Sequence, residues 1–235
     1  MNKEKIFKKN RFLYWLYKIQ KIYKNKKPNI HYGEFGEDIL VDRIFKNKNY
    51  GTYVDIGAYH PFKGSLTQKL YSKGWKGINI DLSKTSIDLF DIARPNDLNI
   101  NCAIGIKNEE TSFFQNSLIN QQNSLKRQNP NQKEIKIKCF RLDDLLISKK
   151  IKNVDYINID TEGTELDVIK GIDFEKTKPL LLTIEDNNFD NKADSKIEKI
   201  YYMKNLGYEL INTIGVTMFF FRNEMISKLS ELIKI

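Results

Sequence analysis

The sequence predicts a mainly parallel, doubly wound α/β sheet of seven strands that closes with an antiparallel hairpin, preceded by a basic amphipathic helix. Three observations predict this fold class. Short apolar runs alternate with helical patterns from Tyr50 onward, glycines end many of these elements, and a turn at Gly215 joins the last two runs. A chain of 235 residues with 40% hydrophobic side chains can build the core of one compact domain, which we place at residues 28–235.

The strands are expected where apolar and β-branched residues form short runs that are bounded by glycine, proline or polar residues. They span residues 53–56, 77–81, 98–103, 154–160, 180–185, 208–212 and 217–222. Two more short strands, at 111–115 and 135–140, flank an irregular region over 116–133 that is rich in Asn, Gln and Ser. A loop of that length inside a compact domain is usually a binding loop or disordered.

The helices are expected between these strands, and each ends at a residue that stops helical structure. They span residues 65–73, 84–93, 165–170 and 193–206, and the residues that stop them are Gly74, Pro95, Gly171 and Gly207. A strand, a helix and the next strand in this order form the crossover unit of a parallel sheet.

The charge is concentrated in the N-terminal segment. Residues 1–27 carry ten basic side chains and one acidic side chain, whereas the rest of the chain carries 29 of each. Apolar side chains lie at helical spacing within this segment, at Phe12, Trp15, Leu16, Ile19, Ile22 and Tyr23. The pattern predicts peripheral association with an anionic membrane. Packing on the body or on a partner subunit is the alternative. A nucleic-acid arm is a third option that the neutral body disfavours.

Several classes of protein are excluded by composition. The two cysteines, Cys102 and Cys139, are too few for a disulfide framework, and with two histidines they lack the spacing of a zinc site. No uncharged apolar run reaches 18 residues, and the N-terminus lacks the apolar region and cleavage site of a secretory signal. We therefore expect a cytoplasmic protein, with the inner face of the membrane as an option through residues 1–27.

The carboxyl ends of the first two strands point to a nucleoside. Ligands of doubly wound sheets bind at the carboxyl ends of the parallel strands. Asp55 and Gly57 form a strand–helix turn, and Asp81 lies 24 residues beyond Gly57, a spacing that suits an acceptor for ribose hydroxyls. Tyr59 and Pro61 stand where a dinucleotide site needs further glycines, and an acid in the turn would repel phosphate. The pattern therefore fits S-adenosylmethionine (SAM) better than NAD or ATP. A tight turn at Gly57 and a helix cap at Asp81 form the structural alternative.

Five blocks of sequence together resemble the FkbM-type methyltransferases. They are Gly33–Asp38, Tyr53–Pro61, Gly74–Asp81, Val154–Glu165 and Ile184–Glu185. The resemblance implies a Rossmann-like class I, SAM-dependent fold and O-methylation, often of sugar hydroxyls in surface glycans. The cofactor-binding residues expected from the turn and from the resemblance are Glu34, Asp55, Gly57, Ala58, Asp81, Leu82, Cys102 and Ala103. The chain departs from the family at Glu34, where Gln is common, and at Leu66, where Asn is common.

Four residues at strand ends are candidates for accepting the proton of an attacking hydroxyl: Asp160, Glu162, Glu185 and His60. Asp160 is favoured because it stands at the tip of the fourth strand. His60 titrates near neutrality and follows the cofactor turn, although a capping role is an equal alternative. Glu165 opens a helix, where an acid complements the helix dipole.

A metal-assisted reaction is a further hypothesis. Asp160, Asp186 and Asn187 offer hard oxygen ligands at two adjacent strand ends, which would suit Mg²⁺. Carboxylates at strand ends also serve as caps, so the metal stays an alternative.

The sequence thus predicts a SAM-dependent O-methyltransferase that acts on a sugar hydroxyl, in polysaccharide or glycan biosynthesis, with the region 116–133 recognising a polar acceptor. The alternatives are an RNA methyltransferase that uses the basic arm, and a non-catalytic nucleoside-binding or membrane-associated module. Nothing in the sequence indicates the oligomeric state.

Overall fold

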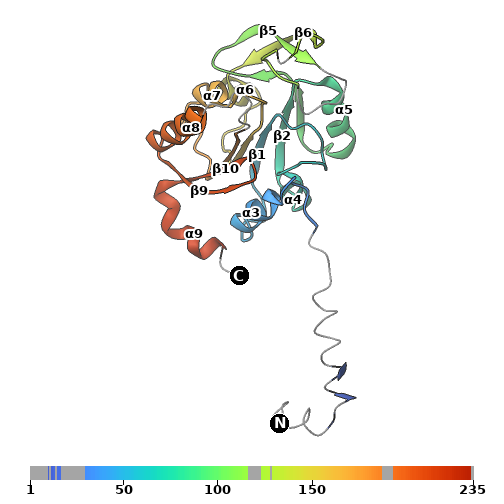
Figure 1. Ribbon diagram of the computed structural model, residues 1–235, viewed down its shortest axis with the longest axis vertical. Coiled ribbons are helices and arrows are strands. Elements are labelled where there is room, and N and C mark those ends of the chain that lie inside the picture. The colour runs from blue at the N-terminus through green and yellow to red at the C-terminus, as the bar shows by residue number, and fades with distance from the viewer. Residues whose placement is uncertain are drawn as a thin grey trace. The chain divides into compact units, whose positions relative to one another are not determined.

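The computed structural model of the protein describes residues 10, 12, 13, 15, 16, 30–115, 123–127, 129–186 and 193–233. The chain divides into two compact units, residues 1–31 and residues 32–235. The second unit holds the sheet and the helices that cover it (Figure 1).

Seven strands form the large sheet, in the spatial order β3-β2-β1-β7-β8-β10-β9. Their bounds are β1 Thr52–Ile56, β2 Lys76–Asp81, β3 Leu98–Asn101, β7 Tyr156–Ile159, β8 Leu181–Glu185, β9 Tyr208–Ile214 and β10 Thr217–Arg222. The first five pair in parallel, while β10 runs antiparallel between β8 and β9. The predicted fold class is confirmed for the sheet. Strand order reverses between β1 and β7, so this fold places its ligand crevice there.

The third predicted strand, residues 98–103, is two strands in the structure. β3 ends at Asn101, opposite Asp81 at the end of β2, so the chain has no further partner in the large sheet. After the buried Cys102 the chain forms β4, Ala103–Ile104, in a second sheet of order β4-β6-β5. The predicted short strands appear there as β5, Glu109–Gln115, and β6, Lys133–Phe140, which pair antiparallel (Figure 1).

Seven α-helices and one short 3₁₀-helix lie in the described part of residues 32–235. They are α3 Glu37–Ile44, α4 Gln68–Ser72, α5 Lys84–Ala93, α6 Leu142–Ser148, α7 Glu165–Lys170, α8 Ala193–Asn205, η1 Asn223–Met225 and α9 Ile226–Ile233. Ser83 caps α5, because its hydroxyl accepts a hydrogen bond from the backbone N–H of Ser86. The helix predicted over 65–73 is shorter than expected, and α6 and α9 were not predicted.

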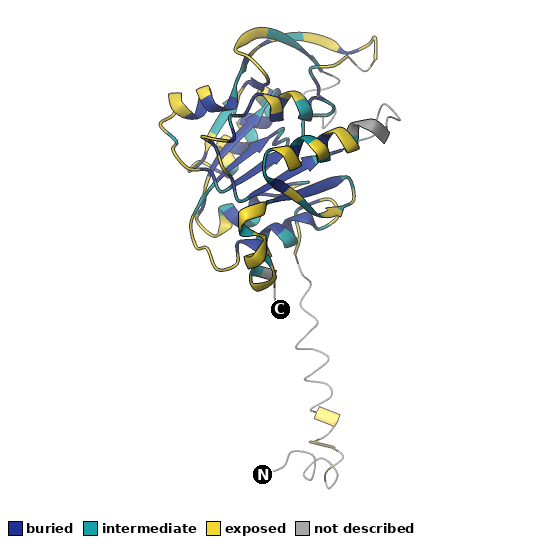
Figure 2. Cartoon of the chain, turned by 90° about the vertical axis from the view of Figure 1, so that its left-hand side faces the viewer, coloured by how far each residue is buried: buried dark blue, intermediate teal, exposed yellow. Residues whose placement is uncertain are grey.

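Successive side chains of a strand point to opposite faces of the sheet and pack in two separate hydrophobic cores. Val54 and Ile56 of β1 pack on one face, in a cluster that contains Val168 of α7 and Met203 of α8. Tyr53 packs on the other face, in a cluster that α3, α4 and α9 help to form. The central strands β1, β7, β8 and β10 are consequently buried on both sides, while the helices keep one side exposed (Figure 2). Each large apolar side chain buried in this way contributes about 1.5–3 kcal/mol.

The predicted basic helix over residues 1–27 falls largely outside the described residues. Within it, Phe12, Leu13, Trp15 and Leu16 have helical conformation and exposed side chains. The rings of Phe12 and Trp15 stack with centroids 6.1 Å apart. No helix among the residues described in the structure is long and apolar enough to cross a membrane.

Candidate functional site

A pocket opens at the carboxyl ends of β1, β2 and β7, where the strand order reverses. Its lining includes seven of the eight predicted cofactor residues, namely Asp55, Gly57, Ala58, Asp81, Leu82, Cys102 and Ala103, together with the predicted catalytic residues Asp160 and Glu162. Segments that are far apart in the sequence therefore meet in one place, as the strand-end argument requires.

The turn after β1 needs glycine for two reasons. Gly57 has φ of +82°, a conformation that costs other residues free energy. A Cβ atom at Gly57 would also lie 1.6 Å from the carbonyl oxygen of Asp160. The backbone N–H of Gly57 donates to the carbonyl oxygen of Ile80 at 2.9 Å, which fixes the turn against β2. Backbone instead of a side chain therefore forms this wall of the pocket.

Asp81 caps the turn after β1 and also lines the pocket. Its Oδ2 accepts a hydrogen bond from the backbone N–H of Tyr59 at 2.9 Å, and its Oδ1 accepts from that of Ser83 at 2.7 Å. Burial raises the pKa of Asp81 to about 6. Each oxygen keeps a lone pair that can accept a ligand hydroxyl. Asp81 thus caps the turn and faces the pocket.

Asp55 belongs to a row of polar residues that crosses the buried sheet. The row takes one residue from each of five neighbouring strands: Asn99, Asn79, Asp55, Asn158 and Thr183. Asp55 Oδ1 accepts from Asn158 Nδ2 at 2.9 Å, and Asp55 Oδ2 accepts from Thr67 Oγ1 at 2.7 Å. Burial raises the pKa of Asp55, and these two bonds oppose that rise. Asp55 therefore also holds the register of β1 against β7.

Arg94, at the end of α5, is fully buried beside this row and was not predicted as part of the site. Its guanidinium donates to Ser65 Oγ at 2.8 Å, Thr67 Oγ1 at 2.8 Å and Gln68 Oε1 at 3.0 Å, and also to the carbonyl oxygen of Pro61. These bonds hold the segment that follows the Gly57 turn, which explains why the helix predicted from residue 65 begins only at Gln68. An isolated arginine in the sequence carries no signal for such a role.

Three carboxyl groups meet at the ends of β7 and β8. Asp160, Glu162 and Glu185 each place one oxygen within 4.8 Å of the others. Among the described residues, Asp160 Oδ1 and Glu185 Oε2 are buried without a hydrogen-bond partner of their own. Burial, followed by the neighbouring Glu185 carboxyl, raises the pKa of Asp160 well above its ordinary value. A carboxylate whose pKa is raised in this way holds a proton that is transferred to it more tightly than an exposed carboxylate does.

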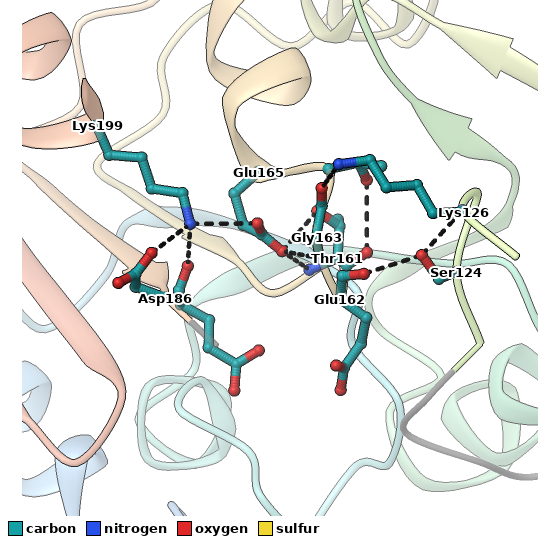
Figure 3. Close-up of polar contacts among 10 residues, drawn as sticks. Ser124, Lys126, Thr161, Glu162, Gly163, Glu165, Asp186 and Lys199 are labelled. Carbon is teal, nitrogen blue, oxygen red and sulfur yellow. Dashed lines mark hydrogen bonds and ion pairs between the residues drawn. The ribbon is translucent and has the colours of Figure 1, made fainter. Parts of the chain in front are cut away.

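Lys199 of α8 lies between Asp186 and Glu165, next to the segments that carry these carboxyls (Figure 3). Its Nζ donates to Asp186 Oδ1 at 2.9 Å, Glu165 Oε2 at 3.3 Å and the carbonyl oxygen of Glu185 at 3.1 Å. Glu165 Oε1 in turn accepts from the backbone N–H of Gly163 at 2.7 Å. One ammonium group therefore ties the turn after β7 to the end of β8, the two segments that carry the clustered carboxyls.

Of the predicted metal ligands Asp160, Asp186 and Asn187, the structure describes the two acids. Asp186 is turned toward Lys199, which neutralises its charge, and Asn187 lies outside the described residues. The oxygens that could hold a divalent cation are those of Asp160, Glu162 and Glu185.

Three other predicted residues, Glu185, His60 and Glu34, do not line the pocket. His60 Nδ1 accepts hydrogen bonds from the backbone N–H groups of Phe62 and Lys63, both at 3.1 Å, so this side chain caps a turn. Burial lowers the pKa of His60. Glu34 is exposed on the bend before α3. Asp38 caps that bend instead, because its carboxylate accepts hydrogen bonds from the backbone N–H groups of Tyr32 and Gly33.

Part of the Asn- and Ser-rich region predicted over 116–133 reaches the pocket. Asn123 and Leu125 line it. Ser124 Oγ donates to the carbonyl oxygen of Glu162 at 2.9 Å, and Lys126 Nζ donates to that of Gly163 (Figure 3). The composition of this region predicted a binding loop but not its individual contacts. Those contacts form because the second sheet holds the segment next to the turn after β7.

Comparison with known proteins gives one family match. The model of the methyltransferase FkbM domain matches residues 55–210. No match to a curated protein was found.

Three solved structures match this chain at low sequence identity. A TehB-like SAM-dependent methyltransferase from Corynebacterium glutamicum is 11% identical, with a TM-score of 0.44 over 88% of this chain and 96% of that one. A protein from Listeria monocytogenes, described as a class I SAM-dependent methyltransferase, is 9% identical and has a TM-score of 0.44. The match covers 90% of this chain and 75% of that one. A protein from Pyrococcus horikoshii, described as an RNA methyltransferase, is 10% identical and has a TM-score of 0.41. The match covers 84% of this chain and 91% of that one. Likenesses with TM-scores below 0.5 do not indicate the substrate of this chain.

Proposed function

The chain belongs to the methyltransferase FkbM family, and on that premise we propose that it transfers a methyl group from SAM to a sugar hydroxyl. The observation that carries the proposal is the pocket itself, whose lining combines residues suited to a nucleoside with the carboxyls of Asp160 and Glu162. The carboxyl of Glu185 lies beside these two, outside the lining.

The residues of the pocket fit SAM. Asp81 offers acceptors to ribose hydroxyls, and the Gly57 turn lets a ligand approach the backbone. Leu82, Ala103 and Leu125 provide an apolar wall for a flat ring. The carboxyls of the pocket complement the cationic sulfonium and amino groups, and they would repel the phosphates of NAD or ATP. When bound, SAM would supply a methyl group to a hydroxyl oxygen, with the sulfur of S-adenosylhomocysteine as the leaving group.

The chain contributes positioning and a proton acceptor to this reaction. The hydroxyl oxygen forms its bond to the methyl carbon as the bond from that carbon to sulfur breaks, and the hydroxyl proton passes to a carboxylate oxygen of Asp160. The proton is held well because the pKa of Asp160 is raised by burial and by Glu185. A positioned base contributes typically about 10²–10⁴-fold, and correct placement of the two reactants contributes more.

The test is a transfer assay with purified protein, SAM and a panel of sugar nucleotides and extracted glycans, read as a mass gain of one methylene unit. Asp160→Asn should bind S-adenosylhomocysteine as the wild type does while losing at least about 10²-fold in transfer. Full transfer by this variant would remove Asp160 from the mechanism. An RNA substrate in the same assay, with binding that weakens steeply as salt rises, would favour RNA methylation instead.

We also propose that residues 1–27 hold the protein at an anionic membrane surface. Support comes from ten basic side chains against one acidic one, and from the exposed rings of Phe12 and Trp15. Protein lacking residues 1–27 should no longer sediment with vesicles that contain phosphatidylserine, yet should bind S-adenosylhomocysteine unchanged. Sedimentation of the truncated protein would refute this role.

A further inference from the structure

Asn123 is a buried amide without a hydrogen-bond partner in the described part of the chain. The residue is 7% exposed and lines the pocket, and neither its Oδ1 nor its Nδ2 is hydrogen-bonded. Leaving a buried polar group unpaired costs about 1–3 kcal/mol. A buried amide that faces a pocket and satisfies no other group of the protein is explained when a ligand completes its hydrogen bonds.

The backbone around Asn123 is held firmly by contacts that do not use its side chain. The neighbouring Ser124 pairs with Phe114 of β5, whose N–H donates to the Ser124 carbonyl oxygen at 2.8 Å. The Ser124 hydroxyl donates to the carbonyl oxygen of Glu162. The segment is thus anchored both to the second sheet and to the turn after β7, and the Asn123 amide is left for the pocket.

The surroundings of Asn123 indicate the chemistry of its partner. Leu125, two residues on, packs with Leu82 and Ala103 in one apolar cluster, and all three line the pocket. Leu82 follows Asp81 directly, so a base attached to a ribose bound at Asp81 would lie against this wall. An amide offers one donor and one acceptor side by side. Adenine offers the complementary pair, an amino donor at N6 next to a ring nitrogen acceptor.

We propose that the Asn123 amide reads the amino group and an adjacent ring nitrogen of the adenine of the bound nucleoside, and so sets the base specificity of the pocket. This inference rests on the proposed function, because it takes the ligand to be SAM or its product.

The test is titration calorimetry of the full-length protein with S-adenosylhomocysteine and with its analogue that lacks the 6-amino group. Wild type should prefer S-adenosylhomocysteine by about tenfold, a factor that corresponds to one buried hydrogen bond. Asn123→Ala should bind S-adenosylhomocysteine about tenfold more weakly and should lose most of this preference. Asn131→Ala, an exposed asparagine of the same region, serves as the matched control and should bind as the wild type does.

Thermal melting without ligand distinguishes recognition from a structural role. Because the Asn123 amide bonds to no described group, Asn123→Ala should melt no lower than the wild type. A variant that melts lower, fails to fold, or keeps both the affinity and the preference overturns the inference while leaving the proposed function intact. Absence of S-adenosylhomocysteine binding by the wild type would overturn the proposed function and this inference with it.

Discussion

Replacing Lys199 with methionine should strongly destabilise the protein, because it leaves two buried carboxylates without their cation. Lys199, Glu165 and Asp186 have side chains that are 6%, 5% and 4% exposed. Removing one partner of a buried ion pair costs about 3–5 kcal/mol. For a chain of this length each kcal/mol lowers the melting temperature by about 2–4 °C, so the expected loss is about 6–20 °C.

The loss should depend on pH with a definite sign. Without the ammonium group, the two buried carboxyls lose their counter-charge, and burial without a cation disfavours the ionised form of a carboxyl. A carboxyl with a raised folded-state pKa is neutral in the fold at low pH and costs stability as pH rises through that range. The variant should therefore be closest to the wild type near pH 4 and furthest from it at neutral pH.

Urea unfolding of four proteins at several pH values measures this effect. Lys204→Met, on the exposed side of the same helix, is the matched control and should change stability by less than about 0.5 kcal/mol. The triple variant Lys199→Met, Glu165→Gln, Asp186→Asn removes the uncompensated charges and should recover much of the loss at neutral pH. If Lys199→Met loses no more than Lys204→Met, or if the triple variant is no more stable than Lys199→Met, the buried charges do not control stability here.

The remaining predictions concern the pocket. Affinity for S-adenosylhomocysteine should weaken as pH falls below about 6, because Asp81 then takes up a proton and loses an acceptor; calorimetry at pH 5 and 7 checks this, and equal affinities would contradict it. Glu185→Gln removes a like charge that raises the pKa of Asp160, so the acidic limb of the transfer rate should move to lower pH, and an unmoved limb would show that the two carboxyls do not interact. Gly57→Ala should lose several kcal/mol in urea unfolding, whereas Gly74→Ala, with φ of +90° and no atom within 4 Å of its added Cβ, should lose about 1 kcal/mol from backbone strain alone. Equal losses would mean that the contact with the Asp160 carbonyl oxygen is relieved at no cost.

Much of the site could be predicted because its chemistry is local to strand ends. In a parallel sheet, all carboxyl ends lie at one edge, so Gly57, Asp81 and Asp160 had to lie near one another once the strands were placed. The same logic could not separate Glu162 and Glu185, which join Asp160, from His60, which caps a turn. All three residues lie at or just after the end of a strand. The direction of each side chain depends on the backbone geometry of the turn, which the residue pattern does not predict.

Local sequence patterns are sufficient for the α/β class, for the succession of strands and helices, and for the residue types at the strand ends. These are properties of period and local conformation, which neighbouring residues control. Two features depend on the folded chain as a whole: Asp186 faces Lys199, and the second sheet brings Asn123 to the pocket. Lys199 lies 34 residues beyond Glu165 and Asn123 lies 39 residues before Glu162. Contacts over such separations depend on the free energy of packing and ion pairing in the whole fold. The residues that neighbour Lys199 or Asn123 in the sequence therefore do not predict them.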